Sequence, residues 1–368
     1  MNVEIPLAKP WLTEYETNRV AESVSSGWLT QAGHEVGLME ESIFSFLNPA
    51  QPENFSVTTA SNGTTALHLI LLAIGVGPGD EVIIPNFAYI AVVNTVLYCG
   101  ATPVLIDCIS KNWNMDKGSA ISAITSKTKA IIFVDNYGNL EDLEEFRKKI
   151  PKEIKLIRDA AESFPGKSFD GSAFNGADFT SFSFYANKVF TAGEGGAIYG
   201  ATEDIEKISI LKNQALENKG TFKHKSIGYN YRLSNMHAAI FNAQWSRSEN
   251  ILRERARVFA KYEKLLQTSS LSYKSNFEAN PWLFTIRLFE NYPIVHLRDR
   301  LNEHGIETRP GFSLFSDHAY IAKNSRLIDD NGEAIKISKE IISLPTWPEL
   351  SEEKIEYIVH NLVETVSK

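Results

Sequence analysis

Residues 155–199 read KLIRDAAESFPGKSFDGSAFNGADFTSFSFYANKVFTAGEGGAIY. Three short apolar runs, at 155–159, 179–184 and 196–199, are typical of buried strands, and glycine-containing segments separate them. An acid ends the first run, and a lysine follows the second. Because open α/β sheets bind ligands at the carboxyl ends of their strands, this stretch predicts both a sheet and the edge where a site forms.

The same alternation of apolar runs with helix-period segments extends over about the first 200 residues. It predicts an α/β fold, a mostly parallel seven-stranded sheet covered by helices. The four further strands that we expect are 56–59, 81–84, 103–107 and 130–135. The helices that we expect are 64–74, 88–98, 117–124 and 141–150.

From about residue 235 the pattern changes to one long, charge-rich helix that ends near residue 266. The elements expected after it are a strand at 282–288 and helices at 293–304 and 351–366. This order predicts a smaller C-terminal α+β domain. We therefore expect a large domain over residues 1–245 and a small domain over 246–368, bridged by the long helix.

Charge and composition restrict the function. The 368 residues include 37 Lys and Arg against 45 Asp and Glu, a formal net charge of −8 without a long basic run, which argues against nucleic-acid binding. The scattered histidines form no metal-binding motif, so no catalytic metal is expected. Cys99 and Cys108 are expected as reduced thiols. No segment reads as a signal peptide or membrane span, so we expect a cytoplasmic protein without a membrane partner.

The segment Ser61-Asn62-Gly63-Thr64-Thr65 follows the first expected strand and opens a helix. A helix N-terminus offers peptide N–H groups and a positive dipole end to a phosphate, and the Thr64 hydroxyl adds a donor. Ser, Asn and Gly are also common helix-starting residues. The segment alone therefore leaves phosphate binding and simple capping open.

Asp159 and Lys188 stand 29 residues apart, one at a strand end and one just past the next strand. A carboxylate beside a pyridine nitrogen favours the protonated ring, which makes the ring an electron sink. A partly desolvated lysine has a lowered pKa and an amine free to attack an aldehyde. Alone, Asp159 could cap residues 160–162 and Lys188 could be a surface charge. With the phosphate loop and Ser183, they predict a phosphorylated aromatic cofactor held as a Schiff base.

These segments resemble the DegT/StrS-type sugar aminotransferases, pyridoxal 5'-phosphate enzymes of the aspartate-aminotransferase fold (fold type I). The matching segments are residues 26–30, 61–64, 77–82, 100–103, 159–162, 187–188 and 228–232. Within the family, Ala161-Glu162, Asn187-Lys188 and residues 307–310 are most similar to perosamine synthases, which aminate C4 of a nucleotide-linked 4-keto-6-deoxyhexose.

The resemblance implies a role for each matching residue. Lys188 would be the Schiff-base lysine and Asp159 the partner of the pyridine nitrogen, the two catalytic residues. The remaining cofactor contacts would be Glu162 at the ring hydroxyl, Tyr89 on the ring face, and Gly63, Thr64 and Ser183 at the phosphate. Asn230 matches the asparagine that reaches the phosphate from a neighbouring subunit, which implies a homodimer with shared active sites.

Arg309 and His318 are the expected substrate contacts, although Arg309 could instead form a surface ion pair. The expected reaction moves an amino group from an amino acid, L-glutamate first, to C4 of the keto sugar, for surface polysaccharide or O-antigen biosynthesis. The chain departs from perosamine synthases at residues 222–227 and at Ala319 and Tyr320. Amination at C3 of a 3-keto sugar nucleotide and a pyridoxal-phosphate-binding regulator without turnover therefore stay alternatives. Sugar dehydration is disfavoured, because relatives that dehydrate carry histidine in place of the lysine.

Overall fold

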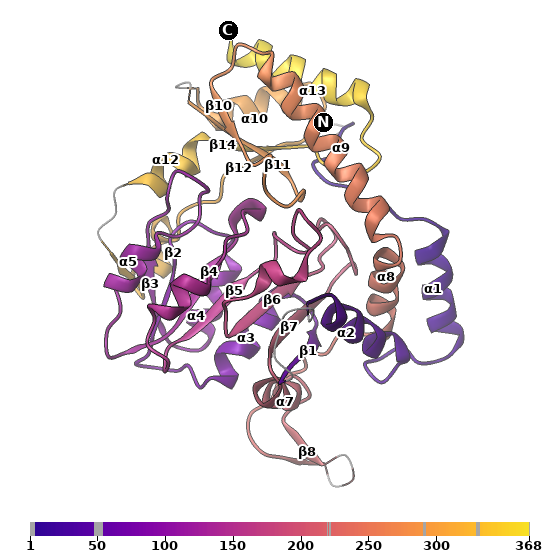
Figure 1. The fold of residues 1–368 in the computed structure, drawn as a ribbon, viewed down its shortest axis with the longest axis vertical. Coiled ribbons are helices and arrows are strands. Elements are labelled where there is room, and N and C mark those ends of the chain that lie inside the picture. Colours follow the sequence, from indigo (N-terminus) through magenta and orange to yellow (C-terminus); the bar gives the residue numbers. More distant parts are fainter. Residues whose placement is uncertain are drawn as a thin grey trace.

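The chain folds around two β-sheets of unequal size (Figure 1). This computed structural model describes residues 4–47, 54–218, 220, 222–289, 292–328 and 332–367. The larger sheet lies in the lower part of Figure 1 and the smaller sheet in the upper part. Two consecutive helices, α8 (Asn235–Trp245) and α9 (Ser248–Gln267), run along one side from the first sheet to the second.

The larger sheet has eight strands in the described residues, in the order β1-β7-β6-β5-β4-β2-β3-β13. Its strands are β1 (Phe55–Ala60), β2 (Glu81–Pro85), β3 (Thr102–Ile106), β4 (Thr128–Val134), β5 (Lys155–Asp159), β6 (Phe179–Ser183), β7 (Gly196–Ala201) and β13 (Arg326–Leu327). Strand β7 is antiparallel to both of its neighbours, and the other pairs are parallel. The predicted mostly parallel sheet is therefore confirmed, with all seven expected strands.

The eighth strand, β13, comes from the C-terminal third of the chain. It pairs with β3 through Arg326 and Leu327 alone, and the Arg326 guanidinium forms an ion pair with Glu81 at 3.0 Å. Two residues are too few to produce a period-two pattern, so the sequence gives no signal for this strand.

Helices cover both faces of the larger sheet, because successive strand residues point to opposite sides. Ile84 packs on one face and its neighbour Ile83 on the other. The first face is covered by α3 (Gly63–Ala73), α4 (Ala91–Tyr98) and α7 (Thr202–Leu211). The other face is covered by α5 (Lys117–Ser122), α6 (Glu144–Lys148), α2 (His34–Leu47) and α8, and α1 (Glu14–Ser25) packs on α8.

The smaller sheet is antiparallel, in the order β10-β11-β14-β12. Its strands are β10 (Tyr273–Ser275), β11 (Phe284–Leu288), β12 (Arg309–Pro310) and β14 (Ile341–Leu344). The helices beside it are α9, α10 (Ile294–Glu303), α12 (Glu333–Glu340) and α13 (Glu352–Val366), whereas Ile321 of α11 (Ala319–Ala322) packs in the core of the larger sheet. Ile5 from the N-terminal segment packs into the same core and pairs with Ile306. The segment that begins at residue 4 is thus attached to this part of the molecule.

The prediction of a single long helix over residues 235–266 is wrong. The chain forms α8 and α9 with a break at Ser246 and Arg247, where Arg247 leaves the helical conformation (φ −116°, ψ 19°). The Arg247 side chain donates to Glu16 at 2.6 Å and to the Trp11 carbonyl at 2.9 Å. The partners of Arg247 are far from it in the sequence. The helical periodicity therefore continues through residues 246–247, and no local pattern indicates the break. The domain boundary between residues 245 and 246 stays a prediction.

Short elements complete the chain. They are β8 (Leu216–Asn218), β9 (Lys223–His224) and the 3-10 turns η2 (Asn136–Gly138), η3 (Gly171–Phe174) and η4 (Phe315–Asp317). Strands β8 and β9 form a hairpin that projects away from the larger sheet at the bottom of Figure 1. None of the helices in the described residues is both long enough and apolar enough to cross a membrane.

Candidate active site

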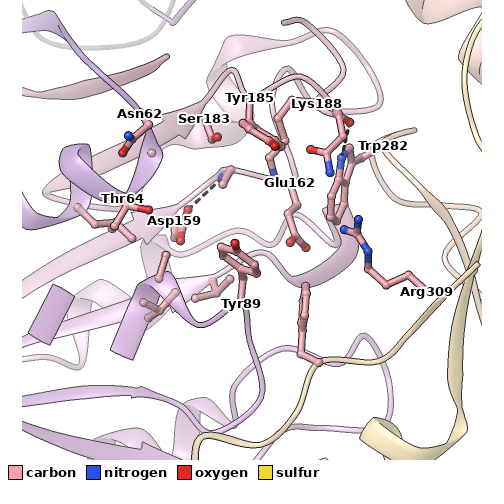
Figure 2. Close-up of a pocket in the computed structure, with 18 of the residues that line it drawn as sticks. Asn62, Thr64, Tyr89, Asp159, Glu162, Ser183, Tyr185, Lys188, Trp282 and Arg309 are labelled. Carbon is pink, nitrogen blue, oxygen red and sulfur yellow. Dashed lines mark hydrogen bonds between the residues drawn. The ribbon is translucent and has the colours of Figure 1, made fainter. Parts of the chain in front are cut away.

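A cavity of about 620 Å³ opens at the carboxyl ends of β4, β5 and β6, where the larger sheet meets β12 of the smaller sheet (Figure 2). The residues that line it are Asn62, Gly63, Thr64, Leu67, Tyr89, Ala91, Val92, Val134, Asp159, Ala161, Glu162, Ser183, Tyr185, Asn187, Lys188, Glu194, Trp282, Arg309, Pro310, Gly311 and Phe312. The cavity thus lies at the sheet edge that the sequence predicted.

The N-terminus of α3 forms one wall of the cavity. Asn62 caps the helix by accepting the Thr65 N–H at 2.9 Å, and the Thr65 hydroxyl accepts the Asn62 N–H at 3.1 Å. Within the described residues, the peptide N–H groups of Gly63 and Thr64 have no acceptor. Capping and anion binding are therefore compatible here, because capping leaves two donors at the positive end of the helix.

Gly63 brings this wall close to the end of β6. A Cβ atom on Gly63 would lie 2.8 Å from the Ser183 Cβ, a separation that real side chains do not adopt. The absence of a side chain therefore lets the Gly63 backbone and the Ser183 hydroxyl share one corner of the cavity. Together with Thr64, they form a cluster of neutral donors suited to a phosphate.

Asp159 ends β5 and is buried, with 7% of its surface exposed. One carboxylate oxygen accepts the Ala161 N–H at 3.1 Å, so the capping role considered from the sequence is also present. Burial raises the pKa of Asp159 to about 6, although the Ala161 bond and nearby Lys188 act in the opposite direction. A cationic nitrogen beside this carboxyl would favour its ionised form.

Glu162 lies one turn further along the chain and is 6% exposed. Its carboxylate accepts the backbone N–H of Tyr137 at 2.6 Å. Tyr137 has a positive φ of 53°, an uncommon conformation for a residue other than glycine. Burial raises the pKa of Glu162 to about 7, while Lys188 and the Tyr137 N–H lower it. Glu162 can therefore gain or lose a proton near neutral pH.

Lys188 occupies the loop between β6 and β7 and points into the cavity (Figure 2). Removal from water lowers its pKa, while the carboxylates of Glu162 and Asp159 raise it. The Lys188 ammonium lies 4.2 Å from the centre of the Trp282 ring. The Trp282 indole N–H donates to the Asn187 carbonyl at 2.9 Å, which fixes the ring against the lysine loop.

The structure brings most of the predicted site residues together in one cavity. Those that line it are Gly63, Thr64, Tyr89, Asp159, Glu162, Ser183, Lys188 and Arg309. No carboxylate among the described residues lies within ion-pair distance of Arg309, so the surface ion pair considered for it is not seen. The roles of these eight residues toward a ligand stay predictions.

Two predicted residues do not line the cavity. Asn230 is exposed and accepts hydrogen bonds from the Arg232 guanidinium at 2.6 and 3.0 Å. The prediction assigns Asn230 to the site of a neighbouring subunit, and it stays a prediction. His318 precedes α11, with its ring 6.0 Å from that of Tyr320. Its contact with substrate also stays a prediction.

Sequence reasoning missed Trp282 and Phe312 as cavity residues. Trp282 was expected only as the start of a strand, and it lies 94 positions from Lys188 in the chain. Phe312 lines the cavity just after β12, a strand of two residues. No local pattern marks either residue, because each reaches the site through a long-range contact.

The cavity combines features that suit one kind of ligand. It offers neutral donors for a phosphate, a carboxyl for a basic ring nitrogen and an amine for a carbonyl carbon. The ring faces of Tyr89 and Trp282 stand on different sides of this space (Figure 2). The residues present therefore fit a phosphorylated aromatic aldehyde.

Comparisons with known proteins cover almost the whole chain. The profile of the DegT/DnrJ/EryC1/StrS aminotransferase family matches residues 10–363. The chain is 32% identical over 371 residues to GDP-perosamine synthase of Escherichia coli O157:H7, covering 99% of each protein. It is 33% identical to GDP-perosamine synthase of Caulobacter vibrioides, covering 96% of each.

A solved structure agrees with the sequence comparisons. Spr1654 of Streptococcus pneumoniae, a proposed sugar aminotransferase, is 25% identical to this chain. Its PMP form superposes with a TM-score of 0.88, covering 100% of this chain and 98% of Spr1654. Its PLP form gives a TM-score of 0.86 over 100% and 99% of the two chains. The predicted fold type is thus confirmed.

Proposed function

Because the chain belongs to the DegT/DnrJ/EryC1/StrS aminotransferase family, it is a pyridoxal-phosphate-dependent sugar aminotransferase, and we propose that its amino acceptor is a nucleotide-linked 4-keto-6-deoxyhexose. The amino donor in this proposal is L-glutamate, and the product carries the amine at C4. The similarity to GDP-perosamine synthases supports the choice of C4. An aminated deoxysugar nucleotide would then serve surface polysaccharide or O-antigen biosynthesis.

One observation carries the proposal: Lys188, Asp159 and Glu162 face a single cavity beside the N-terminus of α3. When bound, pyridoxal phosphate supplies an aldehyde that accepts amines and a ring that accepts electrons. Gly63, Thr64 and Ser183 would hold its phosphate, through the helix N-terminus and two hydroxyls.

The ring would be held by three further residues. Asp159 would pair with the ring nitrogen, and the positive charge there would keep this carboxyl ionised despite its pKa of about 6. Glu162, with a pKa of about 7, would share a proton with the ring hydroxyl. Tyr89 is 57% exposed, so its aromatic face is available to cover the ring.

Lys188 would move the proton that the reaction requires. A lysine with a lowered pKa has a larger fraction of neutral amine at neutral pH than a surface lysine. Its Nζ would take the proton from the substrate carbon and deliver it to C4′ of the cofactor, on the other side of the amino nitrogen. General acid–base transfer of this kind contributes about 10²–10⁴-fold to rates.

The proposal includes a homodimer with shared active sites. Asn230 is exposed on a segment beside the projecting β8–β9 hairpin, in a position to contact a second copy of the chain.

Arg309, and with it His318, would contact the sugar nucleotide, since a guanidinium binds phosphate through two parallel hydrogen bonds. The free thiols of Cys99 and Cys108 fit a reducing compartment, and we place the enzyme in the cytoplasm.

Two assays test the proposal. Incubation of the loaded enzyme with L-glutamate should change the absorbance of the cofactor and release 2-oxoglutarate. The second assay offers GDP-, dTDP- and UDP-linked 4-keto and 3-keto sugars, with the products identified by NMR. An amine at C3 would favour the alternative 3-keto substrate. A chain that binds the cofactor but releases no 2-oxoglutarate would be a regulator without turnover.

A further inference from the structure

Arg255 is a buried charge that the proposed reaction does not use. It lies on α9, which runs from the larger sheet toward the smaller one, and only 2% of its surface is exposed. No carboxylate in the described part of the chain lies within ion-pair distance of its guanidinium, and its Nε has no partner there. Burial lowers the pKa of Arg255 to about 10.

The guanidinium of Arg255 instead donates to three backbone carbonyls on two separate loops. It reaches the Trp282 carbonyl at 2.8 Å, the Pro281 carbonyl at 3.3 Å and the Lys188 carbonyl at 3.3 Å. One of these loops carries the reacting lysine, and the other carries the indole that faces it. Arg255 therefore joins the two loops from behind the cavity wall.

The front of the same wall is joined by Trp282. Its indole N–H donates to the Asn187 carbonyl at 2.9 Å, and its ring face lies 4.2 Å from the Lys188 Nζ. Trp282 is itself only 3% exposed. The residue before the lysine, the lysine carbonyl and the lysine nitrogen are thus each held by Arg255 or Trp282.

The electrostatics of Arg255 favour a specific role over simple packing. A buried cation without a counter-ion loses its hydration and gains no ion pair, so a neutral side chain would be less costly in a purely structural position. An arginine fork presents five N–H donors in one plane, and this can satisfy carbonyls on different segments at once. Arg255 can therefore fix the positions of the Lys188 loop and the Trp282 loop relative to each other.

We propose that Arg255 is a positioning residue that, together with Trp282, holds the Lys188 nitrogen in its reactive place in the cavity. This inference rests on the proposed function, because it takes Lys188 as the reacting amine. Misplacement of a reacting group by about 1 Å can lower the rate by about 100-fold. Loss of the Arg255 contacts behind the lysine should therefore slow the reaction measurably.

The test compares Arg255→Met with Arg257→Met in the loaded enzyme. Arg257 lies on the same helix and also donates to two backbone carbonyls, those of Pro348 and Leu350, at 3.0 and 2.9 Å. The measurements are thermal unfolding, the circular dichroism of the bound cofactor and the single-turnover rate with L-glutamate. Neither of the last two uses the sugar, so a wrong sugar assignment leaves the comparison valid.

We expect both methionine variants to unfold at a lower temperature. Only R255M should weaken the circular dichroism of the bound cofactor and slow the glutamate step, by about tenfold to a hundredfold. Arg255→Lys should recover part of both signals, because one ammonium can still reach a carbonyl. Equal circular dichroism and equal rates in R255M and R257M would assign Arg255 to folding alone and overturn the proposal.

A second pair of variants keeps the proposal testable if R255M does not fold. Trp282→Leu removes the ring face and the indole N–H, whereas Trp282→Phe keeps a ring face beside Lys188. We expect W282L to reproduce the loss of dichroism and rate, and W282F to retain more of both. A W282L enzyme with the dichroism and rate of the unchanged protein would contradict the proposal that Trp282 and Arg255 position Lys188.

Discussion

The cavity has two regions that are built in different ways. Its floor consists of Asp159 and Ser183, the last residues of β5 and β6, with Glu162 and Lys188 from the loops that follow these strands. Asp159, Glu162 and Ser183 are 7%, 6% and 9% exposed. Its rim includes Tyr89, which is 57% exposed, and Arg309, which is also exposed. The floor acids accept backbone N–H groups, whereas no hydrogen bond joins the rim side chains to other described residues.

This difference separates chemistry from specificity. A fixed floor can stabilise charge without reorganising during the reaction. A rim with unused donors can instead bind whatever phosphate or sugar the substrate presents, at little cost to the fold. Changes in the floor should therefore lower the catalytic rate, and changes in the rim should alter substrate affinity.

The strongest test of the floor is Lys188→Ala. We expect turnover to fall by at least about 10²–10⁴-fold, because no other amine lines the cavity in the described residues. The residues proposed to contact the phosphate and the ring remain, so the cofactor should still bind. Steady-state kinetics and equilibrium dialysis of the cofactor measure the two effects.

Lys167→Ala is the matched control for this variant. The Lys167 ammonium also lies over an aromatic ring, 4.8 Å from the centre of Phe277, but outside the cavity. K167A should keep full activity. A K188A enzyme that turns over at the unchanged rate would remove Lys188 from the reaction and, with it, the proposed floor.

Asp159→Asn tests the charge of the floor without its shape. Asparagine keeps the oxygen that accepts the Ala161 N–H, but it cannot stabilise a positive ring nitrogen. We expect the glutamate half-reaction to slow by about 100-fold, as when one preorganised electrostatic partner is removed. Single-turnover absorbance measures this rate.

Asp170→Asn supplies the comparison. Asp170 also accepts a backbone N–H two residues ahead, from Ser172 at 2.9 Å, but on an exposed turn away from the cavity. D170N should leave the half-reaction unchanged. Equal rates in D159N and D170N would show that the charge at 159 has no catalytic role.

Glu162→Gln tests the floor through the pH dependence of stability. The folded chain holds a proton on Glu162 up to a pKa of about 7, while the unfolded chain releases it near the ordinary glutamate pKa of 4.5. The folded state therefore binds more protons between these values, and the free energy of unfolding falls as the pH rises through this window. In the cofactor-free protein, E162Q should remove about 1–2 kcal/mol of this fall.

Urea unfolding at pH 5 and pH 8 measures the effect. Glu16 provides the opposite sign, since burial raises its pKa but bonds from Arg247 and Thr13 lower it below the usual value. E16Q should therefore change stability on the acid side, where the native carboxyl would lose its charge. A pH dependence that is identical in E162Q and the unchanged protein would place the titration elsewhere.

The floor was largely predictable from the sequence, because its signals are local. Each expected strand of the larger sheet exists, and Asp159 is the last residue of one of them, as predicted. A local signal was also missed: Thr13 and Glu16 form a capping box that starts α1, a helix not predicted. That pattern of Thr followed three residues later by Glu is readable without a structure.

The supporting contacts could not be predicted in this way. Arg255 meets Lys188 across 67 positions, and the Tyr137 N–H meets Glu162 across 25 positions. The break between α8 and α9 depends on Arg247 bonding to Glu16, 231 positions away. Periodicity and capping describe segments, and none of these contacts lies within a segment.

Arg309→Met tests the rim and has the smallest expected effect. The guanidinium lines the cavity and has no acid partner in the described residues, so its removal leaves no buried charge behind. We expect KM for the sugar nucleotide to rise about tenfold, the loss of one hydrogen bond to a charged group, with kcat and cofactor binding nearly unchanged. Arg300→Met, which removes an exposed arginine paired with Glu303 on α10, should change neither constant. If R309M instead lowered kcat and left KM unchanged, Arg309 would act in the reaction itself, and the division between a catalytic floor and a binding rim would fail.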